Sequence, residues 1–486
     1  MIRKYYRKYL NISVAARAAM WFVVCTVLQR CISFVSVPIF TRLMPTAEYG
    51  LYSTYLSVYS IATVVCTLSM EKCVYINGIA KASSEKEKDD LAIPLLSLSG
   101  VLTVVLFIVY LIFHNQINGL LKLPTTLMCL VFAQVLFEPA VVFWSTKQRY
   151  EYKYIALVAL TIGMVVANAA LGILFVVLSK TNQAVARVFS IVIVQVIIGC
   201  ICYIYFFRKA GAIFRCKDWK HTLHVQVPLL PHSLSLTVLS SSDRIMINSI
   251  VGTTQAAIYS VAYSCGYVVT TIKNSIVSAM TPWIYEKMKK KDYVSIRLIT
   301  KPIMLLITLM TFAFIAFAPE IVYLLAPKEY HEAIYVIPPV AASSYFTFLY
   351  NMFSNVSFYY EETKKIMFAS ISGAILNLIL NGICIPIFGY VAAGYTTLVC
   401  YMMFTVAHYF IMKTISRKEG ITEDIFDMKF ILIVSATVLV ITTAFSFIYS
   451  STIIRYSVLL LLLGVIVLKR RYFFDTLKVI KEKPNA

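Results

Sequence analysis

Two opposite charges stand side by side in an otherwise apolar part of the chain, Asp243 and Arg244 in LSLTVLSSSDRIMINSI. A charge at bilayer depth costs about 2.5–3.5 kcal/mol on insertion scales, so such a residue needs a protein partner, water or a ligand. Arg30 and Lys273 also lie deep within apolar runs. Arg binds phosphate oxygens in a bidentate manner and Lys acts as a point charge. We therefore predict that Arg30, Arg244 and Lys273 bind an anionic group such as phosphate or pyrophosphate.

The polar residues around Arg244 recur at intervals of three and four, which places them on one face of a helix. The segment 44–53, MPTAEYGLYS, resembles 251–260, VGTTQAAIYS, at an offset of 207 residues, and the same offset brings further polar positions into register. A polar face of a membrane helix must contact protein or water. It can therefore line a hydrated cavity, or it can join neighbouring helices through hydrogen bonds. The predicted lining of a hydrated cavity comprises Thr26, Ser33, Tyr52, Ser60, Thr63, Thr67, Ser233, Thr237, Ser240, Asn248, Tyr259, Tyr267, Thr270 and Asn274.

The elements that carry these residues are expected to be membrane-spanning helices. Of the 486 residues, 60% are hydrophobic and 14% are charged, and apolar runs of about 18–25 residues suffice to cross a bilayer. We predict an all-α polytopic membrane protein with about fourteen spans, centred near residues 26, 60, 102, 134, 166, 195, 238, 268, 308, 345, 377, 401, 438 and 460.

The repeat predicts two pseudo-symmetric six-helix lobes of like orientation, related by an axis along the membrane normal, with a cavity between them. The expected domains are an N-terminal lobe (1–207), a basic cytoplasmic linker (208–225), a C-terminal lobe (226–413), and two further helices with a basic tail (414–486).

The net charge of +21 is explained by the predicted topology of the chain in the membrane. With fourteen spans, 34 of the 44 Lys and Arg residues fall on one side of the membrane and five on the other. The loops rich in Lys and Arg are typically the cytoplasmic ones. This predicts that both termini are cytoplasmic, and it requires no nucleic-acid partner. The 11 cysteines lack metal-site spacings and are expected to be free thiols.

The remaining charges allow more than one interpretation. Asp243 is predicted to be a counter-ion for a cation on a neighbouring helix or, alternatively, a proton or sodium site. Glu138 is predicted to pair with a cavity cation or, alternatively, to bind a coupling ion. We expect Arg17 and Arg187 to reach the headgroups, and the acidic run 85–90, EKEKDD, to form a solvated loop.

Motifs of soluble enzymes do not occur in the sequence. There is no GxxxxGK[ST] loop, no HExxH and no GxSxG. We predict a protein that is not an enzyme and that needs no cofactor or metal. A membrane glycosyltransferase or polymerase is disfavoured because large loops with catalytic acids are missing.

The segment VPLLPHSLSLTVLSSSDRIMINSIVGTTQAAIYSVAY resembles the bacterial polysaccharide (O-antigen and capsule repeat-unit) flippases of the multidrug/oligosaccharidyl-lipid/polysaccharide exporter superfamily. VPIFTRLMPTAEYGLYS and ILNLILNGICIPIFGYVAAGYTTLVCY agree as well, although GYVAAG replaces a glycine-rich GxxGA turn. The resemblance covers essentially the whole chain. It carries family features onto Asp243, Arg244, Arg42, Asn377, Asn381 and Pro386.

The resemblance implies alternating access and a lipid-linked substrate: an undecaprenyl-pyrophosphate-linked oligosaccharide moved from the cytoplasmic to the periplasmic leaflet of the inner membrane. It also implies functional association with a polysaccharide polymerase and glycosyltransferases. Two rivals remain open: a flippase for a peptidoglycan or teichoic-acid precursor, and a secondary exporter of soluble molecules. The sequence does not choose among a proton gradient, a sodium gradient and the membrane potential as the driving force.

Overall fold

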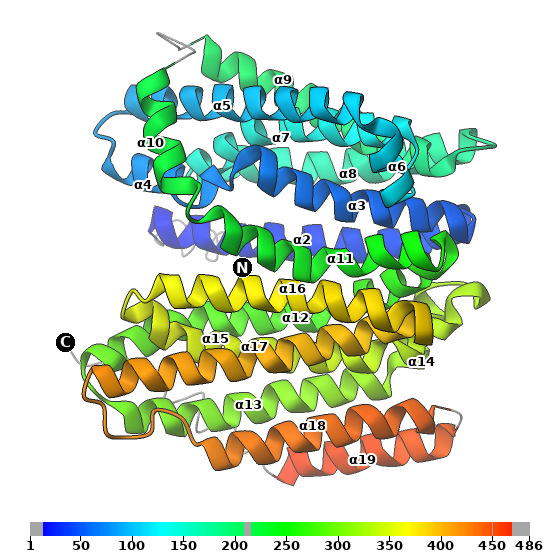
Figure 1. Cartoon of the computed structure of the whole chain (residues 1–486), viewed down its shortest axis with the longest axis vertical. Coiled ribbons are helices and arrows are strands. Elements are labelled where there is room, and N and C mark those ends of the chain that lie inside the picture. Colours follow the sequence, from blue (N-terminus) through cyan, green and yellow to red (C-terminus); the bar gives the residue numbers. More distant parts are fainter. Residues whose placement is uncertain (1–12, 209–214, 450, 469–486) are drawn as a thin grey trace, which may run out of the picture. The chain divides into compact units, whose positions relative to one another are not determined.

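A computed structural model describes residues 13–208, 215–449 and 451–468 (Figure 1). Every element in these ranges is a helix. Fourteen of the described helices have 17 or more residues: α2 (Val14–Leu43), α3 (Thr46–Thr67), α5 (Glu85–Ile112), α7 (Thr125–Tyr150), α8 (Tyr154–Leu178), α9 (Gln183–Phe207), α11 (Leu230–Ile250), α12 (Thr253–Lys289), α13 (Tyr293–Ala316), α15 (Ile337–Tyr359), α16 (Thr363–Phe388), α17 (Val391–Lys418), α18 (Met428–Ile448) and α19 (Thr452–Leu468). The shorter ones are η1 (Met70–Lys72), α4 (Val74–Lys81), α6 (His114–Leu121), α10 (Cys216–Gln226), α14 (Ala318–Leu325) and η2 (Lys328–Tyr335).

The long helices are those of a multi-pass membrane protein. Among the described residues, nine helices are long and apolar enough to cross a membrane, and up to eleven spans result if each of two bent helix pairs counts as one. The other three long helices are α11 and α12, which carry many of the polar residues singled out above, and α19, which has 17 described residues. Each predicted span centre falls within one of the fourteen long helices. The all-α polytopic fold is confirmed.

The internal repeat is visible in the helix boundaries. α2 ends at Leu43 and α3 begins at Thr46, whereas α11 ends at Ile250 and α12 begins at Thr253, the same boundaries shifted by 207 residues. The order of elements then repeats, because α5, α6, α7, α8 and α9 correspond to α13, α14, α15, α16 and α17. α18 and α19 follow the second copy, as the sequence predicts. The two six-helix repeats with two added helices are thus confirmed along the chain.

One span differs between the copies. α3 ends at Thr67, and the segment Met70–Lys81 continues at an angle of 67°. Leu68 and Ser69 between them have φ values of 50° and 52°, a left-handed conformation that costs a non-glycine residue about 1–2 kcal/mol. The Ser69 amide donates to Thr67 Oγ1 at 3.2 Å, which helps to hold the break. In the second copy α12 continues from Thr253 to Lys289 without such a break.

Contacts divide the chain into two compact units, one up to Ala257 and one from Ile258, and each is described separately below. In unit 1, one apolar cluster surrounds Tyr55, whose hydroxyl donates to Gln134 Oε1 at 2.6 Å. In unit 2, the main cluster joins α12, α13, α15, α17 and α18. The predicted lobe boundaries were drawn from the sequence repeat, whereas the two units are defined by contacts. The lobe boundaries therefore stay a prediction. The predicted cytoplasmic termini lie outside the described residues.

The acidic run 85–90 is not the solvated loop that we expected. It forms the first turns of α5, with Ser84 as N-cap accepting a hydrogen bond from the Glu87 amide at 3.2 Å. Asp89 is 2% exposed and forms an ion pair with Lys147 of α7, which is 1% exposed. A capping box, Ser-x-x-Glu at 84–87, was the sequence signal for a helix start. We expected these charges to be solvated because their partners lie far away in the sequence.

Candidate functional site: charged and polar side chains of the membrane helices

Arg244 projects from α11 toward α3 within unit 1. Its Nη1 lies 3.4 Å from the Oγ of Ser57, and the side chain is only partly buried. The preceding residue, Asp243, is 1% exposed, and adjacent helical residues point about 100° apart. The two charges therefore occupy different environments: Asp243 is enclosed by the fold, and Arg244 lies where α11 packs on α3.

The polar stripe of α11 is divided between local and tertiary hydrogen bonds. Thr237 Oγ1 donates to the Ser233 carbonyl and Ser240 Oγ to the Thr237 carbonyl, both at 3.0 Å. These three side chains are partly buried. Asn248 is 3% exposed and its Nδ2 donates to the Leu121 carbonyl at 3.0 Å. Asn248 thus joins α11 to the last turn of α6, whose terminal carbonyls lack helical partners.

On α3, the predicted stripe meets Glu138 of α7. Thr63 Oγ1 donates to Glu138 Oε2 at 3.0 Å, and the Tyr59 hydroxyl also hydrogen-bonds to this carboxyl group. Ser60 Oγ returns to the Leu56 carbonyl at 2.8 Å. Within the described ranges, Glu138 forms no ion pair with a cation. The structure therefore brings two predicted groups together, with hydroxyls as the partners of Glu138.

Thr67 and Tyr52 mark the ends of the α3 stripe. Thr67 is buried next to the break after α3, where its Oγ1 accepts the Ser69 amide. Tyr52 is partly buried, with its ring 5.8 Å from that of Tyr49.

The predicted residues of α2 lie on an exposed face of unit 1. Thr26, Arg30 and Ser33 are all exposed, and the hydroxyls of Thr26 and Ser33 bond to carbonyls of their own helix at 2.8 Å. The opposite face of α2 packs on α8, where Cys25 Sγ lies 2.9 Å from Thr161 Oγ1.

Lys273 is the most enclosed of the predicted cations. It lies on α12 in unit 2 and is 5% exposed. In the part of the chain that the structure describes, its ammonium group has neither a hydrogen-bond nor an ion-pair partner. The α12–α15 contacts before and after it are polar: Thr270 Oγ1 lies 3.1 Å from Ser344 Oγ, and Thr281 Oγ1 donates to Asn355 at 3.3 Å. Lys273 is therefore a buried cation that lies along α12 between two polar contacts of this helix with α15.

The other predicted residues of α12 are not equivalent. Tyr267 is 44% exposed and Asn274 is also exposed, so both face away from the core of unit 2. Tyr259 is completely buried, with its ring 5.6 Å from that of Tyr263.

Arg187 contradicts the expectation that it reaches the headgroups. This residue of α9 is 6% exposed, and its guanidinium carbon lies 4.0 Å from the ring centroid of Phe40 on α2. Its Nη1 donates to the Asn168 carbonyl of α8 at 2.8 Å. Gly172 makes room for it, because a Cβ there would lie 2.2 Å from Nη1. Sequence reasoning missed this cluster because its members come from three different helices.

The residues that the family resemblance adds are structural in their contacts. Asn377 Nδ2 on α16 donates to Thr397 Oγ1 of α17 at 3.0 Å, and Asn381 Nδ2 donates to Asn377 Oδ1 at 3.3 Å. Both asparagines are fully buried. Arg42 is exposed in the last turn of α2, and its Nη1 donates to the Pro38 carbonyl of the same helix at 2.9 Å. Pro386 lies in the last turn of α16.

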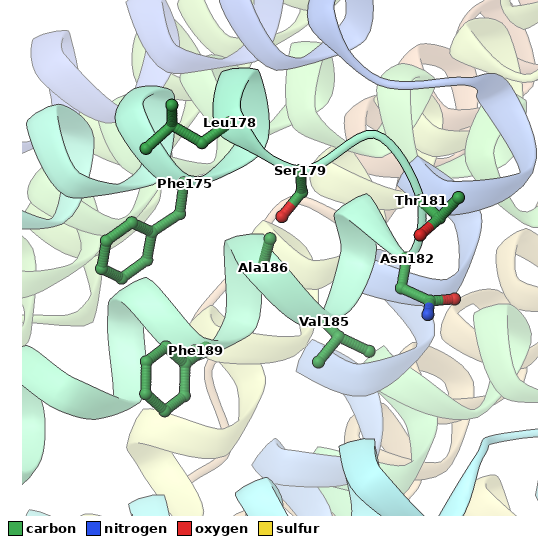
Figure 2. A pocket seen from close by; sticks show the side chains of 8 residues that line it. All are labelled: Phe175, Leu178, Ser179, Thr181, Asn182, Val185, Ala186 and Phe189. Atoms are coloured by element: carbon green, nitrogen blue, oxygen red, sulfur yellow. The ribbon is translucent and has the colours of Figure 1, made fainter.

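A surface hollow at the α8–α9 turn does not coincide with these residues. It has a volume of about 370 Å³ and is lined by Phe175, Leu178, Ser179, Thr181, Asn182, Val185, Ala186 and Phe189 (Figure 2). None of the residues predicted to bind substrate lines it. Its walls carry no charged side chain, so it offers nothing to hold an anion.

In the described residues, fourteen long helices with an internal six-helix repeat, and charged residues within these helices, define a multi-pass helical membrane protein. The polysaccharide biosynthesis protein family matches residues 15–288, and the chain belongs to this family. The MatE family matches residues 228–383. The resemblance seen in the sequence is thereby confirmed. No curated protein matches the chain significantly.

Solved structures with the same fold include transporters and a flippase. One is an inward-facing multidrug resistance MATE family transporter of the MOP superfamily, at 13% identity and a TM-score of 0.61, covering 84% of this chain and 100% of that one. Another is the lipid II flippase MurJ in an inward closed conformation, at 14% identity and a TM-score of 0.59, covering 93% and 99%. A third is a MOP superfamily transporter from Pyrococcus furiosus, described as having a binding pocket of reverse polarity, at 15% identity and a TM-score of 0.51, covering 85% and 96%. At these identities the likeness shows the fold.

Proposed function

We propose that this protein is a flippase that translocates undecaprenyl-pyrophosphate-linked oligosaccharide repeat units from the cytoplasmic to the periplasmic leaflet. Membership of the polysaccharide biosynthesis protein family supports a role in making a surface polysaccharide. The fold shared with a lipid II flippase supports movement of a lipid-linked substrate. The cytoplasmic membrane, with both termini in the cytoplasm, is the proposed location, in line with the Lys and Arg asymmetry of the loops.

The burial of Lys273 without a counter-ion is the observation that carries the proposal. A buried, uncompensated cation is unfavourable by several kcal/mol, so a membrane helix that retains one needs a use for it. Pyrophosphate oxygens would compensate the charge during transport. Arg244 and Arg30 are the proposed additional cations, each able to bind such oxygens bidentately.

In the proposed mechanism, these three cations line a central cavity that opens to one side of the membrane at a time. They replace water around the pyrophosphate, while the polar stripe hydrogen-bonds the sugars and the polyprenyl chain stays in lipid. Two negative charges that move outward against an inside-negative potential gain about 2.3 kcal/mol per charge per 100 mV. The membrane potential could therefore bias the direction of transport without a coupling ion.

Glu138 and Asp243 are the proposed sites if an ion gradient drives the cycle. Glu138 accepts hydrogen bonds from hydroxyls and has no cation partner in the described ranges, so it has the surroundings of a carboxyl that can hold a proton. Asp243 is enclosed next to Arg244. Glu138→Gln should abolish a dependence of transport on the proton gradient, whereas a flippase driven by potential alone would be unaffected.

The test is complementation of a strain that lacks the flippase, read out as surface polysaccharide. Arg244→Ala, Arg30→Ala and Lys273→Gln should each reduce the polysaccharide at least tenfold while the protein inserts at normal levels. Lys180→Gln is the matched control, because Lys180 is an exposed cation in the α8–α9 turn. Normal polysaccharide from Lys273→Gln and Arg244→Ala would show that these cations do not bind the substrate.

A flippase for a peptidoglycan or teichoic-acid precursor is the second candidate, favoured by the likeness to a lipid II flippase over 93% of this chain. Rescue of cell-wall growth after depletion of the resident lipid II flippase would support this candidate over the first. A secondary exporter of soluble molecules would instead transport in vesicles that contain no lipid carrier. Association with a polymerase and glycosyltransferases is proposed with the first candidate, and co-purification with these proteins would test it.

A further inference from the structure

α10, the short helix between α9 and α11, has no part in the proposed transport mechanism. In Figure 1 it runs across the ends of neighbouring helices of unit 1 and is steeply inclined to α5. A helix in this position lies along the plane of the membrane when the long helices cross it. α10 is therefore placed where interfacial helices lie.

One face of α10 is docked on unit 1. Trp219 Nε1 donates to Ser97 Oγ of α5 at 3.2 Å, and Arg215, just before the helix, forms a 2.8 Å ion pair with Asp90. Thr222 and Gln226 on the same face are 2% exposed. These contacts hold the helix against α5 and determine which face is turned outward.

The outward face is basic. Lys217, Lys220, His221 and His224 are all exposed, and at 100° per residue they cover an arc of about 100° opposite Trp219 and Gln226. The acidic residue of α10, Asp218, lies on the flank and is 3.9 Å from Arg215.

Apolar side chains continue this face toward the start of α11. Val227 is 49% exposed and Leu229 is 40% exposed, directly after the last turn of α10. A basic helix face followed by exposed aliphatic side chains is typical of a segment that rests on anionic lipid. A solvated linker or a docking site for an acidic protein would not need the aliphatic residues at the membrane boundary.

We propose that the outward face of α10, with Val227 and Leu229, binds the anionic phospholipid headgroups of the leaflet at this end of unit 1. The lysines attract the headgroup phosphates and the two aliphatic side chains enter the acyl boundary. Because α10 joins α9 to α11, lipid binding there stabilises the docked position of the segment that connects the two sequence repeats. The inference does not depend on the substrate proposed above.

The full-length protein in nanodiscs provides the test. Hydrogen exchange of residues 216–229 is compared in pure phosphatidylcholine and in a 7:3 mixture with phosphatidylglycerol. We expect exchange to slow by roughly fivefold or more in the anionic mixture. Lys217→Gln/Lys220→Gln should remove the difference without changing exchange in phosphatidylcholine, since neither lysine takes part in the docking contacts.

Lys289→Gln/Lys291→Gln is the matched control, because it removes the same charge from exposed positions at the C-terminal end of α12 and just beyond it. This variant should keep the lipid-dependent slowing. Equal exchange in both lipids for the natural protein would overturn the proposal, as expected if the basic face serves an acidic protein instead. Retention of the slowing in Lys217→Gln/Lys220→Gln, or its loss in the control variant, would also overturn it.

Discussion

Replacing Lys147 by methionine should lower the free energy of unfolding by about 3–5 kcal/mol, because it leaves Asp89 charged and buried. The two side chains are 1% and 3% exposed and form an ion pair between α7 and α5. Glu151 loses a contact of 3.7 Å with Lys147 but keeps Lys153 at 2.8 Å. The main penalty therefore falls on Asp89, whose side chain is only 3% exposed.

The converse change, Asp89→Asn, should cost less, about 1.5–3 kcal/mol, the range for a hydrogen bond to a charged group. Lys147 then still donates to the Tyr205 hydroxyl at 3.1 Å and remains 3.7 Å from Glu151. The double variant Lys147→Met/Asp89→Leu should lie within about 1 kcal/mol of the natural protein, because both charges are gone and both replacements are apolar.

Thermal unfolding of the purified protein in detergent measures the relative stabilities of these variants. The loss in Lys147→Met corresponds to roughly 6–20 °C, at about 2–4 °C per kcal/mol for a unit of this size. Lys153→Gln is the control from the same cluster: Lys153 is half exposed in its pairs with Glu85 and Glu151, and its loss should cost less than about 1 kcal/mol. If the double variant melts as low as Lys147→Met alone, packing rather than the negative charge of Asp89 is responsible, and the reasoning is refuted.

Two further substitutions test close contacts in unit 1. Gly50→Ala should destabilise the protein by about 1–3 kcal/mol or more, because a Cβ would lie 1.8 Å from the Thr253 carbonyl oxygen. Gly163→Ala, whose Cβ meets nothing within 4 Å in the interior of α8, should stabilise it by about 0.5–1 kcal/mol; equal melting temperatures for the two would contradict the clash. Arg187→Lys should cost about 1–2 kcal/mol, because an ammonium group cannot stack on Phe40 as the planar guanidinium does. A lysine variant that melts with the natural protein would show that this stacking contributes nothing.

The local sequence pattern was sufficient to predict the helices and the internal repeat. The offset of 207 residues, read from two short segments, matches the helix boundaries at Leu43 and Thr46 and at Ile250 and Thr253. The positions of the spans were equally accessible, because hydrophobic length is a property of a continuous segment. Helical spacing also identified α11 and α12 as polar on one face, before any neighbour was known.

The break after α3 was not accessible in this way. Leu68 and Ser69 are neither glycine nor proline, yet they take up left-handed conformations, whereas α12 continues past its own Pro282. Tertiary contacts therefore override the local preferences at both places.

The partners of the polar residues were decided by the tertiary structure alone. Thr63 meets Glu138, Asp89 meets Lys147, and Arg187 lies on Phe40, in each case across more than 50 residues of sequence. The sequence of a helix determines which residues share a face, because that depends on the period of the helix. Which face meets which depends on the packing of all the helices at once, and in a low-dielectric interior that packing decides whether a charge is a structural contact or is left for a ligand.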